Sequence, residues 1–306
     1  MLGRWSVAGS GAAVLLLLFF LLDARQPPSP RPISVQLEEA VRYRFIAPPA
    51  NLSAAPSGLN QTTHWLSKLR VFLQLMQATA MPVFLAHGTL LGWARGDGFI
   101  RDTTDIDLAV GIGHYRPEFL KLMERLSYPR LDAFFGKSEE DLELSFIMEG
   151  GLKVDLFFAF PNKSRGHGFY MPGVYNDKHV LLYWDYPLIQ PLQLCSSTLI
   201  GLDVLVPCQW EAMLELQYGP HWRQPIPNKD WTWHSSAANI HWGPVEPPST
   251  VLYHPYPPRP RDSKRDRRLL LDYQRSFDIK PIHYRPLASP TSPAFRSKST
   301  SERIRP

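Results

Sequence analysis

The residues of this chain best suited to chemistry are two aspartates separated by one residue. Asp105 and Asp107 lie in the stretch Thr104–Val110, TDIDLAV, which alternates polar and apolar residues with the period of a β-strand. Because side chains two apart on a strand share a face, both carboxylates are expected on the same side. Adjacent carboxylates repel, and a hard divalent cation such as Mg²⁺ or Mn²⁺ would supply the charge between them. The alternative is a solvated edge strand.

A glycine–threonine turn precedes this strand. Gly88 and Thr89 follow the apolar run Val83–Leu85, and Leu90–Trp93 is expected to open a helix. Glycine lets a ligand approach the main chain closely. Backbone amides at this turn and the Thr89 hydroxyl could hold phosphate oxygens. The turn is weak evidence alone, but together with the later aspartate pair it indicates a phosphate and metal site.

A predicted β-hairpin carries a third aspartate. The run Leu142–Met148 alternates polar and apolar residues, and the largely apolar run Leu152–Phe160 is expected to form a second strand. Gly150 and Gly151 between them indicate a turn. Asp155 lies in the second run, where a lone carboxylate would be costly to bury. It therefore needs a partner.

Two interpretations of Asp155 follow. It could pair with Lys153, which is two residues away on the same face of the strand. It could also join Asp105 and Asp107, either as a metal ligand or as the base for an attacking acceptor hydroxyl. Glu143, on the neighbouring strand, is a second candidate base.

These motifs, in this order, resemble those of the LicD/fukutin family. HGTLLGW and DxDL carry the likeness, which covers about residues 64 to 240 and continues in later segments: Phe135–Lys137, Leu142–Phe146, Lys153–Phe158, Val206–Cys208, Tyr218–Trp222 and Asp230–Trp233. The resemblance implies a nucleotidyltransferase-like fold of the α/β (α+β) class, a mixed β-sheet flanked by helices. It also implies transfer of a phospho-alditol or phosphocholine group from a CDP-linked donor to a glycan, with ribitol 5-phosphate on O-mannosyl glycans as the favoured case.

The resemblance also suggests residue roles. It implies that one or two Mg²⁺ or Mn²⁺ ions bridge the donor pyrophosphate, with Asp105, Asp107 and Asp155 as catalytic groups and metal ligands. The residues expected to bind the donor phosphates are Gly88, Thr89, Lys137 and Lys153, the two lysines being favoured over Arg95 and Arg101 as counter-charges because they lie in family-like motifs.

Two rival functions remain open at this point. One is transfer of phosphocholine or of a nucleotidyl group by the same carboxylates. The other is an inactive lumenal protein that binds a glycan or positions another Golgi transferase. The presence of all three carboxylates and of the glycine turn favours an enzyme.

Composition sets broad limits. A chain of 306 residues with 44% hydrophobic residues can form one catalytic domain with a substantial core, expected at residues 62–243. The net charge of +5 is modest and lies largely in a Pro-rich basic tail, residues 244–306, which is expected to be disordered. Nucleic acid is therefore a poor candidate partner. Cys195 and Cys208 could form one disulfide or remain two buried thiols.

The N-terminal region indicates a secretory-pathway address. Residues 1–25 contain an apolar run, for which a type II signal anchor is favoured over a cleaved signal peptide or a buried helix. Residues 26–61 are expected to form a Pro/Ser-rich stem. The predicted location is the Golgi or ER membrane with a lumenal catalytic domain. Sequons at Asn51, Asn60 and Asn162 agree with this location.

Local patterns predict the remaining elements. Apolar spacing indicates helices from about Thr62 to Met76, from Pro117 to Leu126, and from Pro207 to Gly219. The Gly- and Pro-containing stretch Lys163–Tyr175 is expected to be a loop that folds over the substrate. Nearby aromatic residues are numerous enough for a sugar or base platform, although a core role is more common: Phe169, Tyr170, Tyr175, Tyr183, Trp184 and Tyr186.

Overall fold

The computed structural model describes residues 42–45, 59–96, 98–175, 180–189, 191–227, 230–245, 251–253, 259–282 and 285–286. The predicted anchor in residues 1–25 and the sequon residue Asn51 lie outside these ranges. No helix among the described residues combines the length and the apolar character needed to cross a membrane.

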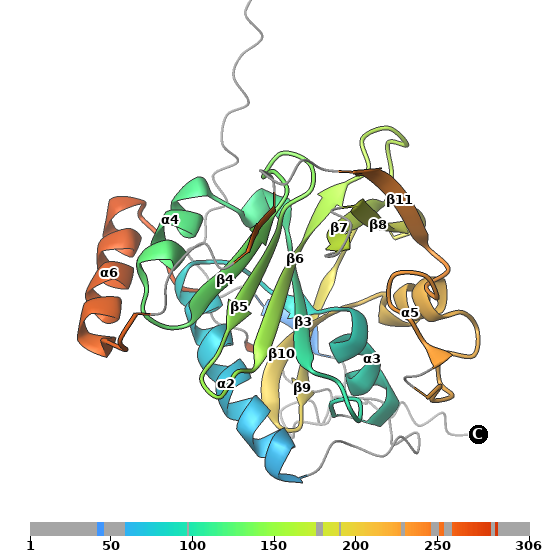
Figure 1. Cartoon of the computed structure of the whole chain (residues 1–306), viewed down its shortest axis with the longest axis horizontal. Helices are drawn as coiled ribbons and strands as arrows, with labels where there is room; N and C mark the ends of the chain where they lie inside the picture. The colour runs from blue at the N-terminus through green and yellow to red at the C-terminus, as the bar shows by residue number, and fades with distance from the viewer. Residues whose placement is uncertain are drawn as a thin grey trace, which may run out of the picture. The chain divides into compact units, whose positions relative to one another are not determined.

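A nine-stranded mixed sheet is the larger of the two sheets in the described residues (Figure 1). Its strand order is β11-β8-β7-β6-β5-β4-β12, and β3 pairs with β6 and with β2. The strands are β2 (Phe84–Leu85), β3 (Asp105–Gly111), β4 (Arg130–Phe135), β5 (Glu143–Ile147), β6 (Lys153–Pro161), β7 (Phe169–Tyr175), β8 (Val180–Tyr186), β11 (Ile240–Val245) and β12 (Val251–Tyr253). The expected mixed sheet and the hairpin of β5 and β6 are both present.

Strand β6 is the centre of this sheet. It pairs in parallel with β3 and antiparallel with β5 and β7. Its residues from Val154 to Phe160 are all buried. A strand that is hydrogen-bonded to neighbours and covered on both faces needs a continuous apolar sequence, which explains the run VDLFFAF and makes Asp155 exceptional within it.

A second, four-stranded sheet has the order β10-β9-β1-β13. It contains β1 (Arg42–Phe45), β9 (Leu194–Leu199), β10 (Leu202–Pro207) and β13 (Arg285–Pro286). A disulfide joins Cys195 in β9 to Cys208 just after β10. Strand β1 comes from the stretch 26–61 that was predicted to be a stem, so this part of the stem is paired into the fold.

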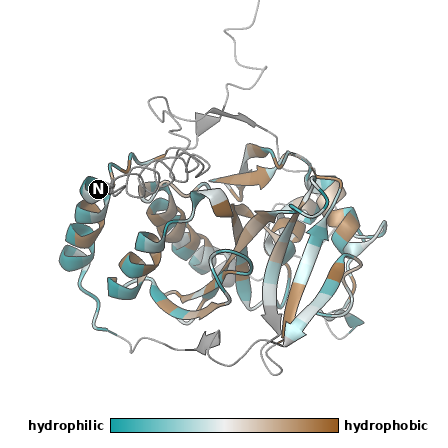
Figure 2. Ribbon diagram, turned by 90° about the horizontal axis from the view of Figure 1, so that it is seen from above, coloured by the Kyte–Doolittle hydropathy of each residue, from teal (hydrophilic) through white to brown (hydrophobic). Residues whose placement is uncertain are grey.

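Five α-helices flank the sheets in the described residues: α2 (Leu59–Ala78), α3 (His87–Gly96), α4 (Pro117–Arg125), α5 (Trp210–Tyr218) and α6 (Ser263–Ser276). Figure 2 shows that they carry both hydrophilic and hydrophobic residues. In α2 the buried residues Leu69, Phe72 and Met76 follow helical spacing. The ring of Phe72 packs edge-on against Phe146 of β5, with 5.2 Å between ring centroids.

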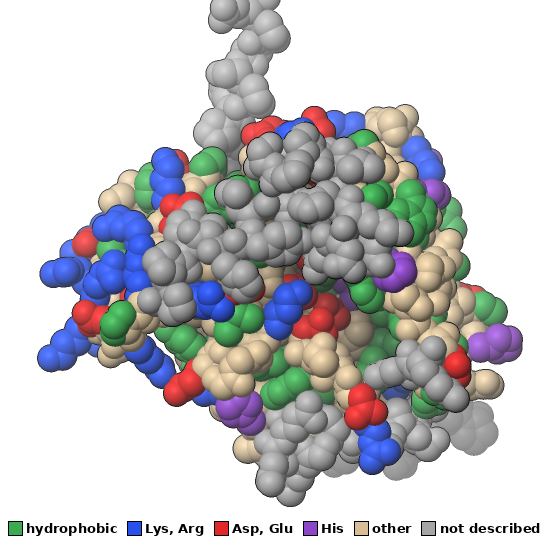
Figure 3. All heavy atoms as spheres, in the orientation of Figure 1, with side chains coloured by type: hydrophobic (Ala, Val, Ile, Leu, Met, Phe, Trp, Pro, Cys, Tyr) green, Lys and Arg blue, Asp and Glu red, His purple; other side chains and the backbone are tan. Residues whose placement is uncertain are grey.

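Helix α6 corrects the prediction that the whole C-terminal tail is disordered. The carboxylate of Asp262 accepts a hydrogen bond from the Arg265 amide at 2.9 Å and caps the helix. Leu269 and Tyr273 are buried at i, i+4 spacing, a short apolar signal that the surrounding charges obscured. The carboxylate of Asp266 also accepts hydrogen bonds from Ser127, just after α4. Lys and Arg side chains gather over these two helices, at the left of Figure 3.

The stretch Lys163–Tyr175 was also predicted incorrectly in part. Its second half is β7, which pairs with β8 over seven residue pairs, Pro172 included. Gly173 is required there by close packing, because an added Cβ would lie 2.6 Å from the Trp184 ring. Gly173, one of the residues that suggested a loop, therefore reflects tight packing within a strand.

Candidate active site

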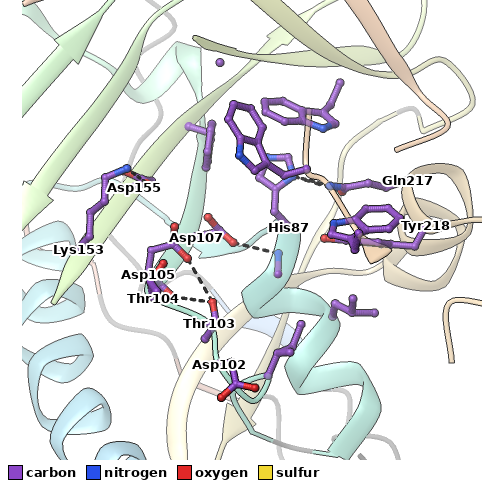
Figure 4. Close-up of a pocket in the computed structure, with 18 of the residues that line it drawn as sticks. His87, Asp102, Thr103, Thr104, Asp105, Asp107, Lys153, Asp155, Gln217 and Tyr218 are labelled. Carbon is purple, nitrogen blue, oxygen red and sulfur yellow. Dashed lines mark hydrogen bonds and ion pairs between the residues drawn. The ribbon is translucent and has the colours of Figure 1, made fainter. Parts of the chain in front are cut away.

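The three aspartates meet on one face of the sheet. Strands β3 and β6 are parallel, and their register sets Asp105 opposite Lys153 and Asp107 opposite Asp155. Because alternate residues share a face, all four side chains point to the same side. One carboxylate oxygen from each of the three aspartates lies within 4.8 Å of the others (Figure 4).

The glycine–threonine turn at the start of α3 holds Asp107 in place. The Gly88 amide donates a hydrogen bond to Asp107 Oδ2 at 2.9 Å, and the Asp107 amide donates to Thr89 Oγ1 at 2.8 Å. A Cβ at Gly88 would lie 3.1 Å from Asp107 Oδ2, so a side chain there would crowd the carboxylate. Thr89 is buried beneath Asp107, whereas Gly88 lines the cavity in front of it.

Lys153 is the cation closest to the cluster. Its Nζ lies 2.9 Å from Asp155 Oδ2, so Asp155 both pairs with Lys153 and faces the other two aspartates. The two interpretations of Asp155 are therefore compatible. Burial alone would lower the pKa of Lys153, but the charge and hydrogen bond of Asp155 outweigh that effect, and the pKa is raised.

The electrostatics of the cluster fit a divalent cation. Burial, followed by the charges of Asp105 and Asp155, raises the pKa of Asp107 well above its ordinary value. Burial also raises the pKa of Asp155, although Lys153 opposes the shift. Asp155 Oδ1 is buried without a hydrogen-bond partner. Three converging carboxylates with one lysine leave excess negative charge, and oxygen ligands of this kind suit Mg²⁺ or Mn²⁺.

The carboxylates form one side of a cavity of about 460 Å³. Aromatic and polar side chains from distant parts of the chain form the other side: Trp184 of β8, Gln217 and Tyr218 of α5, Trp222, Trp231 and Trp233. Figure 4 shows Gln217 and Tyr218 across from Asp105 and Asp107. A site with a charged side and an aromatic side can hold an anionic group and a ring or apolar group of the same ligand.

His87 lies between these two sides. Its ring packs against Phe157 and Trp184, each with centroids 4.6 Å apart. Its Nδ1 lies 2.9 Å from Gln217 Nε2, while the Tyr186 hydroxyl donates to Gln217 Oε1 at 3.0 Å. Burial lowers the pKa of His87 to about 4, with the Gln217 hydrogen bond opposing the shift. His87 is therefore neutral at pH 7, and it ties α3 to α5.

Glu143 and Arg95 also line the cavity. Glu143 is buried on β5, two residues from Ser145, which is the register partner of Asp155. The Glu143 side chain therefore lies on the same face of the sheet as the carboxylate cluster. Arg95 donates through Nε to the Trp222 carbonyl at 2.7 Å and through Nη2 to the Gln224 carbonyl at 2.9 Å. Its guanidinium therefore anchors the segment that carries Trp222.

Lys137, predicted to bind the donor, lies outside this group. It is exposed and is not part of the cavity wall, and its amide donates to the Asp141 carboxylate. Arg101 is also exposed and outside the wall. The sequence likeness around Lys137 thus reflects a structured turn with Gly136 at φ +73°.

Two predicted glycosylation sites lie within the described residues. Asn60 is in the first turn of α2. Asn162 lies in the turn after β6, where its Oδ1 accepts from the Ser164 hydroxyl at 2.8 Å and its Nδ2 lies 3.5 Å from Asp185 Oδ1. Glycosylation of either residue stays a prediction.

Comparison with known proteins identifies relatives of this domain. Residues 80–209 match the family described as LicD/FKTN/FKRP, nucleotidyltransferase domain. Over 172 residues the chain is 30% identical to mouse ribitol-5-phosphate transferase FKTN and 28% identical to the human protein of that name. Each match covers 56% of this chain and 35% of the relative. An uncharacterized Caenorhabditis elegans protein is 31% identical over 188 residues, which are 58% of this chain and 48% of that one.

These matches cover between a third and a half of the relatives' own lengths. A solved structure, the lincomycin-bound lincosamide antibiotic adenylyltransferase LnuA, aligns with a TM-score of 0.29 at 12% identity, over 48% of this chain and 83% of that one. That score is too low to support an inference. The resemblance to the LicD/fukutin family is nevertheless confirmed by the domain match and the sequence relatives.

Proposed function

We propose, from the match of residues 80–209 to the LicD/FKTN/FKRP nucleotidyltransferase domain, that this protein is a metal-dependent, glycan-modifying transferase. It moves a phospho-alditol group, with ribitol 5-phosphate as the first choice, from a CDP-linked donor to a glycan on a glycoprotein. The choice of ribitol rests on the FKTN relatives, which are ribitol-5-phosphate transferases by name.

The observation that carries this proposal is the convergence of three carboxylates on one cavity wall. Asp105, Asp107 and Asp155 offer oxygen atoms within 4.8 Å of one another. These residues would hold Mg²⁺ or Mn²⁺, which supplies charge neutralisation for the donor pyrophosphate and the leaving CMP. An inactive binding protein would gain nothing from burying this much uncompensated negative charge.

The chain's own residues have distinct roles in this proposal. Gly88 and Thr89 fix the position of Asp107 through hydrogen bonds to its carboxylate and its amide. Lys153 pairs with Asp155, opposes the rise in its pKa that burial causes, and can approach a donor phosphate from the same side of the sheet. Glu143, buried in the same cavity, is the candidate base that removes the proton from the acceptor hydroxyl.

We also place the reaction in the lumen of the secretory pathway. The support is the disulfide between Cys195 and Cys208, since disulfides persist mainly in oxidising compartments. The sequons and the apolar run in residues 1–25 agree with this location.

A transfer assay tests the proposal. The full chain is incubated with CDP-ribitol, Mg²⁺ and a pool of glycoproteins, and the release of CMP and the addition of ribitol phosphate to glycans are followed by mass spectrometry. Asp155→Asn is expected to lower the rate about a thousandfold. The matched control is Asp203→Asn, an exposed strand aspartate in the other sheet, which should keep full activity. Equal activity in both variants would exclude the assigned role of the cluster.

A further inference from the structure

Two tryptophans are unusually exposed close to the cavity. Trp233 is 44% exposed and Trp242 is 54% exposed. Tryptophan is mostly buried in folded proteins, and exposed aromatic groups near a site often mark a binding surface. Trp242 lies on β11, which is the edge strand of the large sheet and pairs with β8.

These tryptophans continue an aromatic series that begins inside the cavity. The Trp184 and Trp233 rings have centroids 6.0 Å apart, and both residues line the cavity. The series continues from Trp233 to His234 at 5.2 Å and from His234 to Trp242 at 6.4 Å. We call Trp184, Trp233, His234 and Trp242 the aromatic strip.

Strand register places Trp184 and Trp242, the two members of the aromatic strip that lie on strands, on one face. Ile240 pairs with Trp184, and Trp242 pairs with Leu182. Opposed residues in an antiparallel pair share a face, as do residues two apart, so Trp242 and Trp184 lie on the same face of the sheet. The aromatic strip therefore leads from the cavity wall outward to the sheet edge.

The chemistry of the aromatic strip fits a sugar chain better than an apolar partner. Sugar rings place their C–H faces against flat aromatic rings and present hydroxyl groups at their edges. A polar group belongs to the strip: the imidazole of His234 lies between its two exposed tryptophans. A lipid or an apolar protein surface would instead require a continuous apolar area.

We propose that the aromatic strip is the binding surface for the acceptor glycan, with sugar rings stacked on Trp242 and Trp233. This inference rests on the proposed function and adds the location of the acceptor. A glycan held there extends along the edge strand into the cavity, so that its terminal hydroxyl approaches the carboxylate cluster past Trp184. Trp242 lies outside the cavity wall, so it contacts the acceptor alone.

The test uses the full chain and separates acceptor from donor. Wild type, Trp242→Ala, Trp242→Tyr and the control Phe277→Ala are applied to an array of protein-linked glycans, and CDP-ribitol binding with Mn²⁺ is measured by calorimetry. Phe277 is 40% exposed just beyond α6 and serves as a matched exposed aromatic residue. Trp242→Ala should weaken glycan retention about tenfold with unchanged donor affinity, Trp242→Tyr should recover part of it, and Phe277→Ala should behave as wild type.

Three results would overturn the inference: no glycan retained by the wild type, equal retention by Trp242→Ala, or an equal loss of CDP-ribitol affinity in that variant. The last would assign the aromatic strip to the donor. If glycans bind through the aromatic strip and CDP-ribitol does not bind at all, the inferred glycan surface stands and the proposed donor chemistry fails.

Discussion

Replacing Asp107 by asparagine should make the metal-free protein more stable and inactive at the same time. The three carboxylates have oxygen atoms within 4.8 Å of one another, with Lys153 as the nearby counter-charge. Two unit charges 4.8 Å apart repel by about 3.5 kcal/mol at an effective dielectric constant of 20. Asparagine keeps an oxygen that can accept the Gly88 hydrogen bond, so the substitution removes charge with little change in shape.

The net gain in free energy of unfolding is expected to be about 1 to 2 kcal/mol. It is smaller than the full repulsion because Lys153 offsets part of it and because burial and the neighbouring carboxylates already raise the pKa of Asp107. For a domain of this size, that gain corresponds to an increase in Tm of roughly 2 to 8 °C. The raised pKa also sets the sign of the pH dependence: the gain shrinks as pH falls, because wild-type Asp107 then takes up a proton and loses its repulsion.

The assay is thermal unfolding of both proteins at pH 8, in EDTA and in Mn²⁺. Without metal the variant should unfold at the higher temperature. With Mn²⁺ at a hundred times its Kd, wild type should gain about 2.7 kcal/mol and the order should reverse. A variant that is less stable than wild type in EDTA, or that gains as much from Mn²⁺, would refute the reasoning.

Three further substitutions test separate parts of the site. Gly88→Ala places a Cβ 3.1 Å from Asp107 Oδ2, so calorimetry should show about tenfold weaker Mn²⁺ binding, while the free energy of unfolding changes by less than ~1 kcal/mol. Unchanged Mn²⁺ affinity would contradict the close approach of the Gly88 backbone to the Asp107 carboxylate. Lys153→Met removes the partner of Asp155, and urea unfolding should show a loss of about 1 to 2 kcal/mol without metal, discounted because the lysine is partly exposed. Because the lysine and a metal ion would compete for the Asp155 carboxylate, Mn²⁺ should bind the variant more tightly, and weaker Mn²⁺ binding would contradict this competition. His87→Gln should make the free energy of unfolding less dependent on pH on the acid side. The pKa of His87 is about 4 in the folded protein against 6.5 for the free side chain, so wild type should lose about 3 kcal/mol of stability as pH falls from 6.5 to 4. An identical slope in the variant would contradict the assignment of His87 as a neutral, buried histidine.

Much of the fold was predictable because its signals are local. The alternation around Asp105 and Asp107, the hairpin of β5 and β6, and the helical spacing in α2 and α4 each occupy fewer than about 20 residues, and all appear where expected. Strand β7 and helix α6 were not predicted, because the composition of each segment is typical of irregular structure. Pro172 and Gly173 suggested a loop, and the basic residues around Leu269 suggested a disordered tail.

The aspartate cluster was predictable in part. That Asp105 and Asp107 share a face follows from strand alternation, but the meeting of Asp107 with Asp155 depends on a parallel pairing between β3 and β6, which are about 50 residues apart. No local pattern specifies that register. The family resemblance supplied only the expectation that the three aspartates form one site.

The opposite wall of the cavity had no local sequence signal. Gln217 lies on the buried side of an ordinary amphipathic helix, and its contact with His87 joins residues 130 positions apart. Trp184 was one of several aromatic residues considered for a sugar or base platform, with a core role favoured. Only the folded arrangement of α3, α5 and β8 distinguishes these side chains from other buried residues.

The most direct test of the central claim is donor binding to the full chain by calorimetry. CDP-ribitol, CDP-glycerol, CDP-choline and CTP are each titrated with and without Mn²⁺, into wild type and Asp105→Ala, with Asp203→Asn as the control. The account predicts Mn²⁺-dependent binding of a CDP-alditol, with CDP-ribitol the tightest, which is lost in Asp105→Ala and kept in the control. Failure of every CDP-linked compound to bind in the presence of Mn²⁺, or binding that survives Asp105→Ala, would contradict it.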